Sequence, residues 1–531
     1  MEQKKGIAYR PNAVKHAFEE SGLAKILDKI TPVDFCEALY AKDNPSLFTR
    51  IQDLNRLLLV EELKTKHREI KKELSMLTPD TSQSVPIVIL NLLEVTEKMN
   101  ERINVFEDGQ YRIYTEERHC WKIVDEKLLL LFLAELAEKT GLSRSESLKR
   151  STIEDLKYQF DLLAQITTPE EEPNIAKINL ANGTFIVSND FVGLREHRSN
   201  DYFCYILPFE YDSEATCPLF LDYLNRALPE NECQMMLAEF AGYPLSRGLK
   251  MEKAAVLFGP GGTGKSTFTE VLSKMYGEEN IGPYSLSSLC GTKDSCSFNR
   301  ADLKNYILNY STEMGGKDCD PNLVKKTISR EPIEARKAYG DPFILRNYCP
   351  VMFNVNEMPP MENTSALRRR INIIPFLNPI PVDQMDVGYA DKIVEKELSG
   401  VFNWALDGLK RLMANKRFTV SRLSEVTAKR LWVENDNVLA FLDTETYIPF
   451  SEKYKLSVDL YQEYKEFCKE NNYRQLSCIK FLRRLEELRF IVDRKATDHK
   501  IRVYCKKQSD IDMAREKELD DAMMRIRMIR N

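Results

Sequence analysis

The sequence predicts an α/β protein whose core is a mostly parallel sheet, with a mixed α+β region before it and a winged helix after it. An apolar run at Ala254–Phe258 leads into a glycine-rich loop and then into a helix-like stretch at Phe268–Met275. Two further strand-like runs follow, at 301–313 and 347–359, and after residue 436 the pattern becomes helix, helix and hairpin. Strands that alternate with helices favour a parallel sheet, which binds ligands at the carboxyl ends of its strands.

The part of the chain before this core is expected to form two regions. Residues 1–105 are predicted to be a mostly helical domain of unknown role, and 106–231 an α+β domain. Within the second region, 110–124 and 175–187 have the alternation and the turn residues of β-hairpins. The acidic, proline-containing stretch 167–174 between them is predicted to be a loop.

Composition excludes several classes of protein. The 531 residues are 43% hydrophobic and 30% charged, as in ordinary globular domains, and the net charge of −5 excludes a uniformly basic nucleic-acid binder. The twelve cysteines and five histidines form no zinc-ligand pattern. Free cysteine thiols in a chain of this size suit a reducing compartment. The first residues lack an apolar signal core, and no apolar run is long enough to span a membrane. We therefore expect a cytoplasmic protein with no membrane partner.

The most specific motif follows the apolar run directly. Gly259–Ser266 fits the phosphate-binding pattern G-x-x-x-x-G-K-[ST] between a strand and a helix. Glycines let backbone N–H groups point into a phosphate-sized concavity beside the positive end of the helix. Lys265 is expected to reach the terminal phosphates, and the Ser266 hydroxyl to bind Mg²⁺. The expected ATP-binding residues are Gly259, Pro260, Gly261, Gly262, Thr263, Gly264, Lys265, Ser266 and Thr267.

Five motifs, in order, resemble the superfamily 3 helicase domain of phage and plasmid primase-helicases and of the related poxvirus primase-helicase. They are GPGGTGKST, ILNYSTEMGG, LVKKTISREPIEARKAYGDPF, MFNVNEMP and RRRINIIPF, within a similarity that spans roughly residues 110–505. The segments 217–249 and 402–412 resemble that family's helical lead-in and closing helix. The resemblance implies an AAA+-like P-loop ATPase domain over 232–425, a winged helix over 436–507 and a ring, expected to be a hexamer.

The resemblance also implies a catalytic carboxylate. Glu313 follows the second strand-like run, where a carboxylate can bind Mg²⁺ through water and orient the attacking water. The second acid that the family often carries nearby is replaced here by residues 309–312, so Glu313 would act largely alone. The expected metal ligands are Ser266 and Glu313. The alternative for Glu313 is an ordinary surface glutamate.

Two further motifs supply candidate catalytic residues. Asn356 matches the family's sensor asparagine, with Asn354 as a weaker candidate, although an asparagine can also simply cap a strand end. Arg369 and Arg370 match the arginine finger, which reaches from one subunit into the neighbour's nucleotide and accelerates phosphoryl transfer. Arg368 is either a third partner or a surface charge. One of the three arginines is expected to form a structural salt bridge.

The segment 325–343 is the candidate DNA-binding element. Turn residues flank a short basic stretch at 336–339, and the resemblance places here a hairpin that projects into the channel of a ring. Basic residues beside an aromatic suit the charge and the bases of single-stranded DNA. The alternative is a solvated hairpin without DNA contact. The expected DNA-binding residues are Lys325, Arg336, Lys337 and Tyr339.

The C-terminal part has the pattern of a winged helix. Residues 457–471 and 477–488 are predicted helices, and 490–505 a hairpin. From 477 to 507 there are ten Lys and Arg residues against four Asp and Glu, which favours contact with phosphates. Winged helices also bind proteins, so this alternative stays open. Residues 508–531 are predicted to form a charged helical tail.

Together these features lead us to expect an ATP-driven, ring-forming replicative DNA helicase of a phage, plasmid or other mobile element. Its ligands would be ATP, Mg²⁺ and single-stranded or forked DNA, with hydrolysis between subunits. No D-x-D pair precedes residue 250, so any primase is expected to be a separate protein. Two alternatives stay open: an origin-binding initiator with secondary ATPase activity, and a non-unwinding signalling or defence ATPase that DNA does not stimulate.

Overall fold

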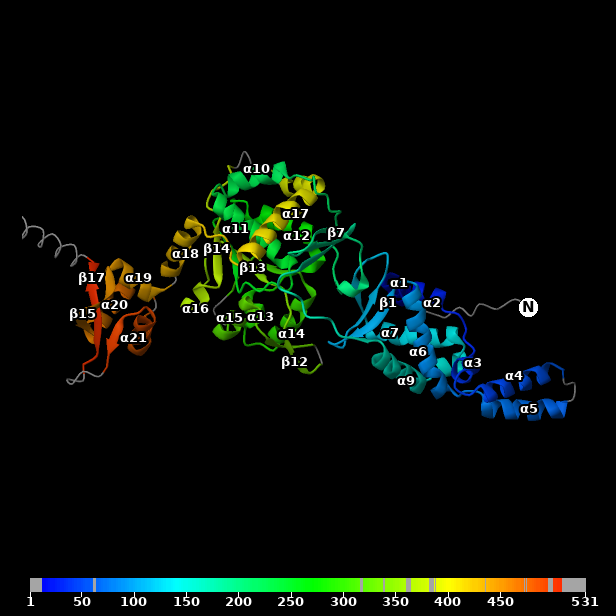
Figure 1. Ribbon diagram of the computed structural model, residues 1–531. Helices are drawn as coiled ribbons and strands as arrows, with labels where there is room; N and C mark the ends of the chain where they lie inside the picture. The colour runs from blue at the N-terminus through cyan, green and yellow to red at the C-terminus, as the bar shows by residue number, and fades with distance from the viewer. Residues whose placement is uncertain are drawn as a thin grey trace, which may run out of the picture. The chain divides into compact units, whose positions relative to one another are not determined.

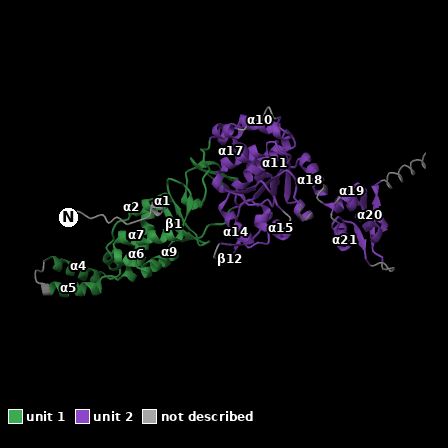
Figure 2. Cartoon of the chain, turned by 180° about the vertical axis from the view of Figure 1, so that it is seen from behind, with its two compact units in different colours: residues 1–171, 177–211 green, residues 172–176, 212–531 purple. Residues whose placement is uncertain are grey.

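The computed structural model (Figure 1) divides into two compact units. Unit 1 is Met1–Glu171 with Lys177–Tyr211, and unit 2 is Glu172–Ala176 with Asp212–Asn531 (Figure 2). The structure describes residues 12–60, 64–315, 319–337, 340–359, 364–381, 386, 388–434, 436–471, 473, 475–494 and 500–508. The predicted tail at 508–531 therefore lies outside the described residues except for Gln508.

Unit 1 combines helices with two small sheets. Its sheets have the strand orders β3-β2-β1-β4 and β5-β6-β7, and both predicted hairpins are present as β2–β3 and β5–β6. The helices are α1 (Asn12–Ser21), α2 (Leu23–Lys29), α3 (Phe35–Tyr40), α4 (Pro45–Val60), α5 (Lys64–Leu77), α6 (Thr81–Lys98), α7 (Glu126–Thr140), α8 (Arg144–Ser147) and α9 (Arg150–Leu163). The strands are β1 (Arg102–Phe106), β2 (Tyr111–Tyr114), β3 (Trp121–Val124), β4 (Gln165–Ile166), β5 (Ala176–Leu180), β6 (Gly183–Val187) and β7 (Val192–Arg195).

One apolar core crosses the boundary that the sequence predicts at residues 105 and 106. It joins Phe18 of α1 and Val88 of α6 to Ile103 of β1 and Phe132 of α7. The predicted boundary also falls inside β1, which pairs with β2. The structure therefore has no boundary between compact units there, because the N-terminal helices bury their apolar faces on the strands and helices that follow.

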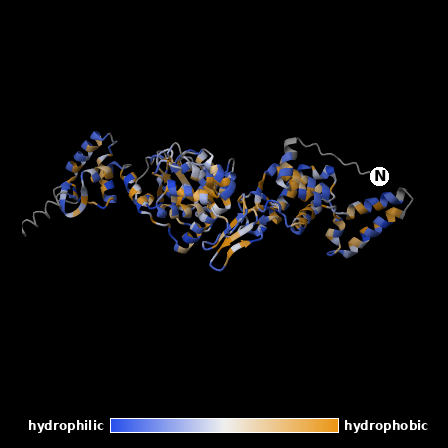
Figure 3. Ribbon diagram, turned by 90° about the horizontal axis from the view of Figure 1, so that it is seen from above, coloured by the Kyte–Doolittle hydropathy of each residue, from blue (hydrophilic) through white to orange (hydrophobic). Residues whose placement is uncertain are grey.

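Helices α4 and α5 form a small antiparallel pair in unit 1. Apolar and polar residues alternate along both helices (Figure 3), and Ile51, Leu54 and Leu74 form a buried cluster between them. Exposed charged residues of α5, such as Lys71 and Lys72, therefore lie on the solvated face of this helix pair.

The core of unit 2 is a five-stranded sheet with the order β14-β8-β13-β10-β9, and its strands are parallel, which agrees with the mostly parallel sheet that the sequence predicts. Every residue of the interior strand β8 is buried, as expected for a parallel sheet covered on both faces. The strands of unit 2 that precede α18 are β8 (Ala254–Phe258), β9 (Ile281–Gly282), β10 (Leu308–Ser311), β11 (Ile333–Arg336), β12 (Pro342–Leu345), β13 (Val351–Val355) and β14 (Ile371–Pro375). The helices are α10 (Pro218–Ala227), α11 (Asn231–Gly242), α12 (Lys265–Tyr276), α13 (Leu286–Cys290), α14 (Ser295–Asp302), α15 (Pro321–Ser329), α16 (Ser365–Arg368), α17 (Tyr389–Asn415) and α18 (Arg422–Glu434).

The strand predicted at 301–313 is shorter in the structure. Only Leu308–Ser311 is extended, because Ala301 and Asp302 end α14 and a short 3-10 turn follows. Arg300 holds this turn region in place by donating to the carbonyl oxygens of Leu289 and Glu334, at 2.7 Å each.

Helices α10, α11 and α17 pack beside this sheet domain of unit 2, and α17 contacts α10, α11 and α12 (Figure 1). The ring of Phe220 on α10 lies 5.0 Å from Trp404 of α17 and 6.5 Å from Phe268 of α12, measured between centroids. The Glu397 carboxylate of α17 accepts from the backbone N–H groups of Leu219 and Phe220 at 2.9 and 3.0 Å, so it caps α10. Because α10 is built into this packing, unit 2 begins before residue 232, the predicted start of the domain.

The chain after α18 forms a separate apolar core in unit 2. Phe441, Tyr464 and Phe481 lie in this core. The helices predicted at 457–471 and 477–488 are present as α20 and α21, and the sheet order is β15-β17-β16. The elements are α19 (Asn437–Thr444), β15 (Tyr447–Leu456), α20 (Ser457–Glu470), α21 (Cys478–Glu487), β16 (Ile491–Asp493) and β17 (Arg502–Lys507). Within the described part of the chain, no helix has the length and apolar character needed to cross a membrane.

Gly408 tests the close packing of α17 on α11. A Cβ at Gly408 would lie 2.3 Å from the backbone carbonyl of Ala238. Alanine is preferred over glycine in a helix by about 1 kcal/mol, yet we expect Gly408→Ala to lower the free energy of unfolding by about 1–3 kcal/mol, because two backbones must separate. Denaturant unfolding measures this change. The exposed neighbour Asp407→Ala should stay within about 0.5 kcal/mol of wild type, and a stabilised Gly408→Ala would show that the helices are not in close contact.

Candidate functional site

The loop between β8 and α12 takes a backbone path that only glycine can follow. Gly259 has φ 156°, and a Cβ there would lie 1.9 Å from the carbonyl oxygen of Phe376. Gly262 and Gly264 have φ values of 77° and 93°, and Gly264 is the residue from which α12 starts. These left-handed conformations are easy for glycine and costly for other residues. The glycine-rich loop, residues 259–264, therefore directs the N-terminus of α12 toward the carboxyl end of the sheet.

Lys265, the first residue of α12, folds back over this loop. Its side chain is buried, and its ammonium donates to the carbonyl oxygens of Gly259 and Pro260 at 2.7 and 2.8 Å. Burial lowers the pKa of Lys265, since a low-dielectric environment disfavours its charged form. A bound anion would have the opposite effect, because it stabilises the ammonium. The lysine is thus placed at the point where an anionic ligand would lie over the loop.

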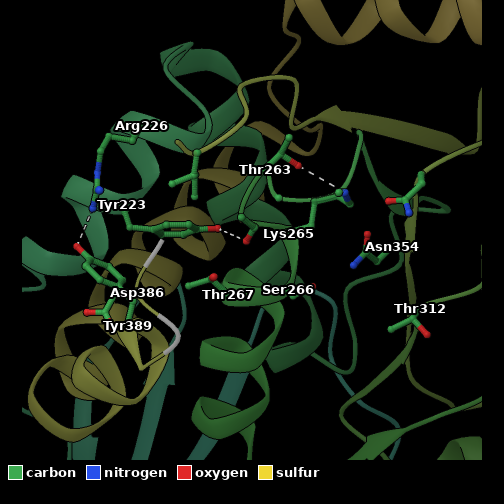
Figure 4. A pocket seen from close by; sticks show the side chains of 15 residues that line it. Tyr223, Arg226, Thr263, Lys265, Ser266, Thr267, Thr312, Asn354, Asp386 and Tyr389 are labelled. Atoms are coloured by element: carbon green, nitrogen blue, oxygen red, sulfur yellow. Dashed lines mark hydrogen bonds between the residues drawn. The ribbon is translucent and has the colours of Figure 1, made fainter. Parts of the chain in front are cut away.

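A cavity of about 490 Å³ opens over the glycine-rich loop (Figure 4). The N-terminal turn of α12, with Lys265, Ser266 and Thr267, forms its floor. In Figure 4 one wall carries Thr312 and Asn354, and the opposite wall carries aromatic and charged side chains. The lining residues are Tyr223, Arg226, Gly261, Gly262, Thr263, Gly264, Lys265, Ser266, Thr267, Thr312, Asn354, Asn356, Ile380, Asp386 and Tyr389. Of the nine residues that the sequence predicts to bind ATP, all but Gly259 and Pro260 line this cavity.

The first wall is built from the ends of β10 and β13. Asn354 is buried near the end of β13, and Asn356 follows that strand with an exposed side chain. Both asparagines line the cavity, as does Thr312, which follows β10. Glu313 is the next residue, but it is exposed and is not among the lining residues. The structure therefore places Thr312 in the cavity lining, whereas Glu313, the predicted catalytic carboxylate, is the next residue and is not part of that lining.

The second wall consists of residues that the sequence did not single out. The Tyr223 hydroxyl on α10 donates to the Gly264 carbonyl oxygen at 2.7 Å, and burial raises the pKa of Tyr223, so that the phenol keeps its proton. Arg226, one turn later, donates to the Tyr389 hydroxyl at 3.0 Å and lies 5.4 Å from the centre of that ring. Asp386 completes this wall and pairs with Lys392. The spacing of Tyr223 and Arg226 on one helix face was the available sequence signal.

Acidic residues do not gather around the cavity. Among the residues that the structure describes, no group of three or more His, Cys, Asp or Glu could hold a metal ion. The oxygen donors near the glycine-rich loop include the hydroxyls of Ser266 and Thr312 and the amides of the two asparagines. This donor set fits a cation that is shared with an anionic ligand, which supplies oxygen atoms of its own.

The three consecutive arginines occupy different environments. Arg370 is buried, and its guanidinium donates to the Ser329 hydroxyl at 2.6 Å and to the Ala366 carbonyl oxygen at 2.9 Å. It also lies 3.7 Å from the Glu331 carboxylate. Arg370 therefore makes the kind of contacts inside its own chain that are expected of the structural arginine among the three, and it fits that role better than the role of a finger.

The other two arginines are less enclosed. Arg369 has an exposed side chain, while its backbone carbonyl accepts from Lys253. Arg368 is half-buried, and burial together with the charge of Arg484 lowers its pKa. No member of this arginine run lines the cavity. If one of the three arginines acts on such a cavity, the cavity must therefore belong to another copy of the chain. Arg369 is the arginine of the three whose side chain is exposed.

The predicted DNA-binding hairpin is present as the antiparallel pair β11–β12. Arg336 ends β11 with an exposed side chain that donates to the Gly340 carbonyl oxygen at 2.8 Å, and Lys337 follows half-buried. Lys325 is half-buried on α15 rather than on the hairpin. Tyr339 lies outside the described residues. The structure thus groups Arg336 and Lys337 at the turn of the hairpin and places Lys325 on the preceding helix.

Arg330 fixes the base of this hairpin, although no sequence pattern indicates this role. It is buried with φ 55°, a left-handed conformation that is unusual for a residue with a side chain. Its guanidinium donates to the carbonyl oxygens of Tyr348, Leu249 and Arg247 at 2.7, 2.8 and 2.7 Å. These three bonds tie the end of α15 to two other segments of unit 2, so the hairpin projects from an anchored base.

Three family models match parts of this chain. One is described as D5 N terminal like and matches residues 94–229, and one described as Poxvirus D5 protein-like matches residues 433–514. The third, a family of unknown function designated DUF5906, matches residues 257–370 and so covers the glycine-rich loop. In the sequence, one D5-type match precedes the strands of the parallel sheet and the other follows them.

Comparison with individual proteins adds two solved structures. A search of curated proteins found no match. The A form apo structure of the NrS-1 C terminal region has 14% sequence identity and a TM-score of 0.43, covering 78% of this chain and 98% of that one. The A form apo structure of NrS-1 C terminal region 305–718 has 13% identity and a TM-score of 0.42, with 79% and 99% covered.

The different environments of the arginines lead to a stability prediction. Arg370→Ala leaves the hydrogen-bonding groups of Ser329 and Ala366 without this partner, and we expect a loss of about 1–3 kcal/mol of unfolding free energy. Arg369→Ala removes an exposed side chain and should change stability by less than about 0.5 kcal/mol. Chemical denaturation of both variants measures the difference. Equal stability of the two variants would contradict the structural role of Arg370.

Proposed function

We propose that this chain, a member of the primase-helicase family related to the poxvirus D5 proteins, is an ATP-driven, ring-forming replicative DNA helicase. It would serve a phage, plasmid or other mobile element. One observation carries the proposal: the glycine-rich loop sets the Lys265 ammonium under a cavity that is large enough for a nucleotide. A loop of this kind at a helix N-terminus is suited to bind phosphates. The mixed α/β architecture with a parallel sheet agrees with an AAA+-like core of superfamily 3.

The two walls of the cavity suit the two ends of ATP. The phosphates would lie over residues 259–267, where Lys265 exchanges its contacts with carbonyl oxygens for contacts with phosphate oxygens. The base would lie toward Tyr389 and Arg226, which offer an aromatic ring and a planar cation at the far wall. The Tyr223 hydroxyl, by holding the Gly264 carbonyl, keeps the loop in its phosphate-binding shape.

Hydrolysis needs a metal ion and an oriented water. Mg²⁺ would neutralise part of the phosphate charge when bound. Ser266 fits as its ligand because the residue lines the cavity, and Glu313 would take part through water from just beyond Thr312. Asn356 and Asn354 are placed to donate their amides to a terminal phosphate or to the attacking water. The sensor role thus has two candidates on one strand end.

Sites shared between subunits follow from where the arginines lie. Since the exposed Arg369 is not among the residues that line the cavity of its own chain, we propose that it completes the cavity of a neighbouring subunit as the arginine finger. A closed ring, with a hexamer as the expected size, gives every subunit such a neighbour. The hairpin β11–β12 would then carry Arg336 and Lys337 toward DNA in the channel.

The C-terminal helices α19 to α21 and their sheet form, in our proposal, a winged helix that contacts DNA. Support comes from the Poxvirus D5 protein-like match over 433–514 and from the excess of basic residues between 477 and 507.

The first test separates nucleotide binding from turnover. Lys265→Ala should abolish ATP binding and hydrolysis, because it removes the phosphate-binding charge. Glu313→Gln should bind ATP with little change and lose at least about 90% of turnover, since the amide cannot act as a base. Binding is measured with a fluorescent ATP analogue and turnover by phosphate release. A Glu313→Gln protein with near wild-type turnover would remove Glu313 from the mechanism.

Mixing experiments test whether the site is shared. Arg369→Ala should bind ATP and hydrolyse it at least about 10³-fold more slowly than wild type. Mixed with Lys265→Ala protein, it should regain part of its turnover, because one subunit contributes the arginine and the other the intact loop. Mass spectrometry of the mixed assemblies controls for subunit exchange. Absence of rescue in assemblies that demonstrably contain both variants would count against a shared site.

A third test concerns the hairpin. Replacing Arg336 and Lys337 with alanine removes two cations, so binding to single-stranded DNA should weaken and depend less on salt, by about two fewer released counterions. Unwinding of a fork should fall more than ATP hydrolysis does. Salt titrations and a strand-displacement assay measure these effects. Lys71→Ala with Lys72→Ala, both exposed on α5, is the matched loss of charge and should behave as wild type. A hairpin variant that unwinds at the normal rate would remove these two residues from the mechanism, whereas a wild-type protein that hydrolyses ATP without unwinding the fork would favour a non-unwinding ATPase.

A further inference from the structure

The sheet β15-β17-β16 has one face in the C-terminal core and a second face outside it. Along β17, Val503 and Cys505 are buried in the core, whereas Arg502, Tyr504 and Lys506 are only partly buried and alternate with them. Alternation with a period of two puts these three residues on the opposite face of the strand. The helices α20 and α21 contribute Tyr464 and Phe481 to the core, so they cover the first face.

Aromatic and apolar residues gather in one row across this outer face. In the strand register Tyr454 of β15 lies opposite Tyr504, and Ile491 of β16 lies opposite Tyr504 on its other side. The two tyrosine rings are 5.7 Å apart between centroids. Tyr454 is 51% exposed and Ile491 54%. We call Tyr454 and Tyr504 the aromatic row, and Ile491 lies beside it in the strand register.

Cations flank the aromatic row on both sides. The Arg502 guanidinium lies 4.9 Å from the centre of the Tyr454 ring, and the Lys506 ammonium lies 4.9 Å from the centre of the Phe450 ring. Asp493 lies opposite Arg502 in the strand register, so this outer face also carries an acidic residue beside Arg502. Two cations spaced along β17 on either side of a tyrosine repeat the alternation of charge and ring that suits a nucleic-acid strand.

We propose that this outer face binds a single strand of nucleic acid, with bases stacked on Tyr454 and Tyr504 and phosphates near Arg502 and Lys506. Exposed rings on a sheet can stack only on unpaired bases, so the face selects a single strand over a duplex. The inference deepens the proposed function, on which its biological role rests, by naming a strand-binding surface besides the hairpin β11–β12. It lies on the face of the sheet opposite α20 and α21.

Binding to the full-length chain tests the aromatic row. Replacing Tyr454 and Tyr504 together with threonine keeps β-forming residues but removes both rings, and we expect binding of a fluorescent mixed-sequence single strand to weaken about ten-fold or more. Phenylalanine at both positions keeps the rings and should bind as wild type. Ile491→Thr, at an exposed position beside the aromatic row, is the matched control and should change affinity less than about two-fold, because no ring is lost. Thermal unfolding verifies that all variants fold.

Photo-crosslinking tests the same contact in the unaltered protein. A single strand that carries bromodeoxyuridine should crosslink to peptides containing Tyr454 or Tyr504, and an excess of unlabelled single strand should compete where duplex does not. Lys506→Gln should lower the salt dependence of binding, whereas the threonine pair should leave it unchanged, because only the lysine releases counterions. These outcomes would support the proposal.

Three outcomes would overturn it. One is a threonine pair that folds and binds like wild type, another is the lack of crosslinks to either tyrosine, and the third is a change of oligomeric state without a change of strand affinity. The last result would identify the face as a protein interface. ATP hydrolysis by the wild-type chain is measured in parallel: its absence would refute the proposed function, while strand binding at the aromatic row would be judged by the variants alone.

Discussion

The site depends on how closely the backbone at Gly259 approaches the residue that follows β14. The carbonyl oxygen of Phe376 occupies the space where a side chain at position 259 would be. Only glycine can therefore occupy this position in the turn after β8. This turn starts the loop that carries Lys265 back over the carbonyl oxygens of Gly259 and Pro260. The strand ends that supply Thr312 and Asn354 meet the loop at the same edge of the sheet, because the strands are parallel.

The opposite wall depends on a second set of contacts, between helices. Glu397 on α17 caps α10, and α10 in turn presents Tyr223 to the carbonyl of Gly264. The wall that would receive the base is therefore joined to the loop that would receive the phosphates through one hydroxyl group. A closely packed pair of helices, α11 and α17, supports this arrangement from behind, with glycine at the contact. The cavity is built as a unit from segments that are distant in sequence.

What could be predicted from the sequence followed from local patterns. The glycine-rich loop, the parallel sheet, the hairpin β11–β12 and the C-terminal helices each show in a short run of residues, whose type and spacing are tied to their backbone conformation. The pairing of Arg226 with Tyr389 joins residues that are 163 positions apart, and no short pattern marks it. Similarly, Arg369 and Arg370 are neighbours with the same chemistry, and only the packing of Ser329 and Ala366 against one of them distinguishes a structural arginine from an exposed one.

The central claim is that ATP lies over the glycine-rich loop and that a neighbouring subunit completes its site. Electron cryo-microscopy of the full-length protein with a non-hydrolysable ATP analogue and forked DNA tests this most directly. Our account predicts a ring with phosphates at residues 259–267, the base beside Tyr389, the neighbour's Arg369 at the terminal phosphate and a single strand along the β11–β12 hairpins. A nucleotide bound elsewhere, or a cavity completed without any neighbouring chain, would contradict it.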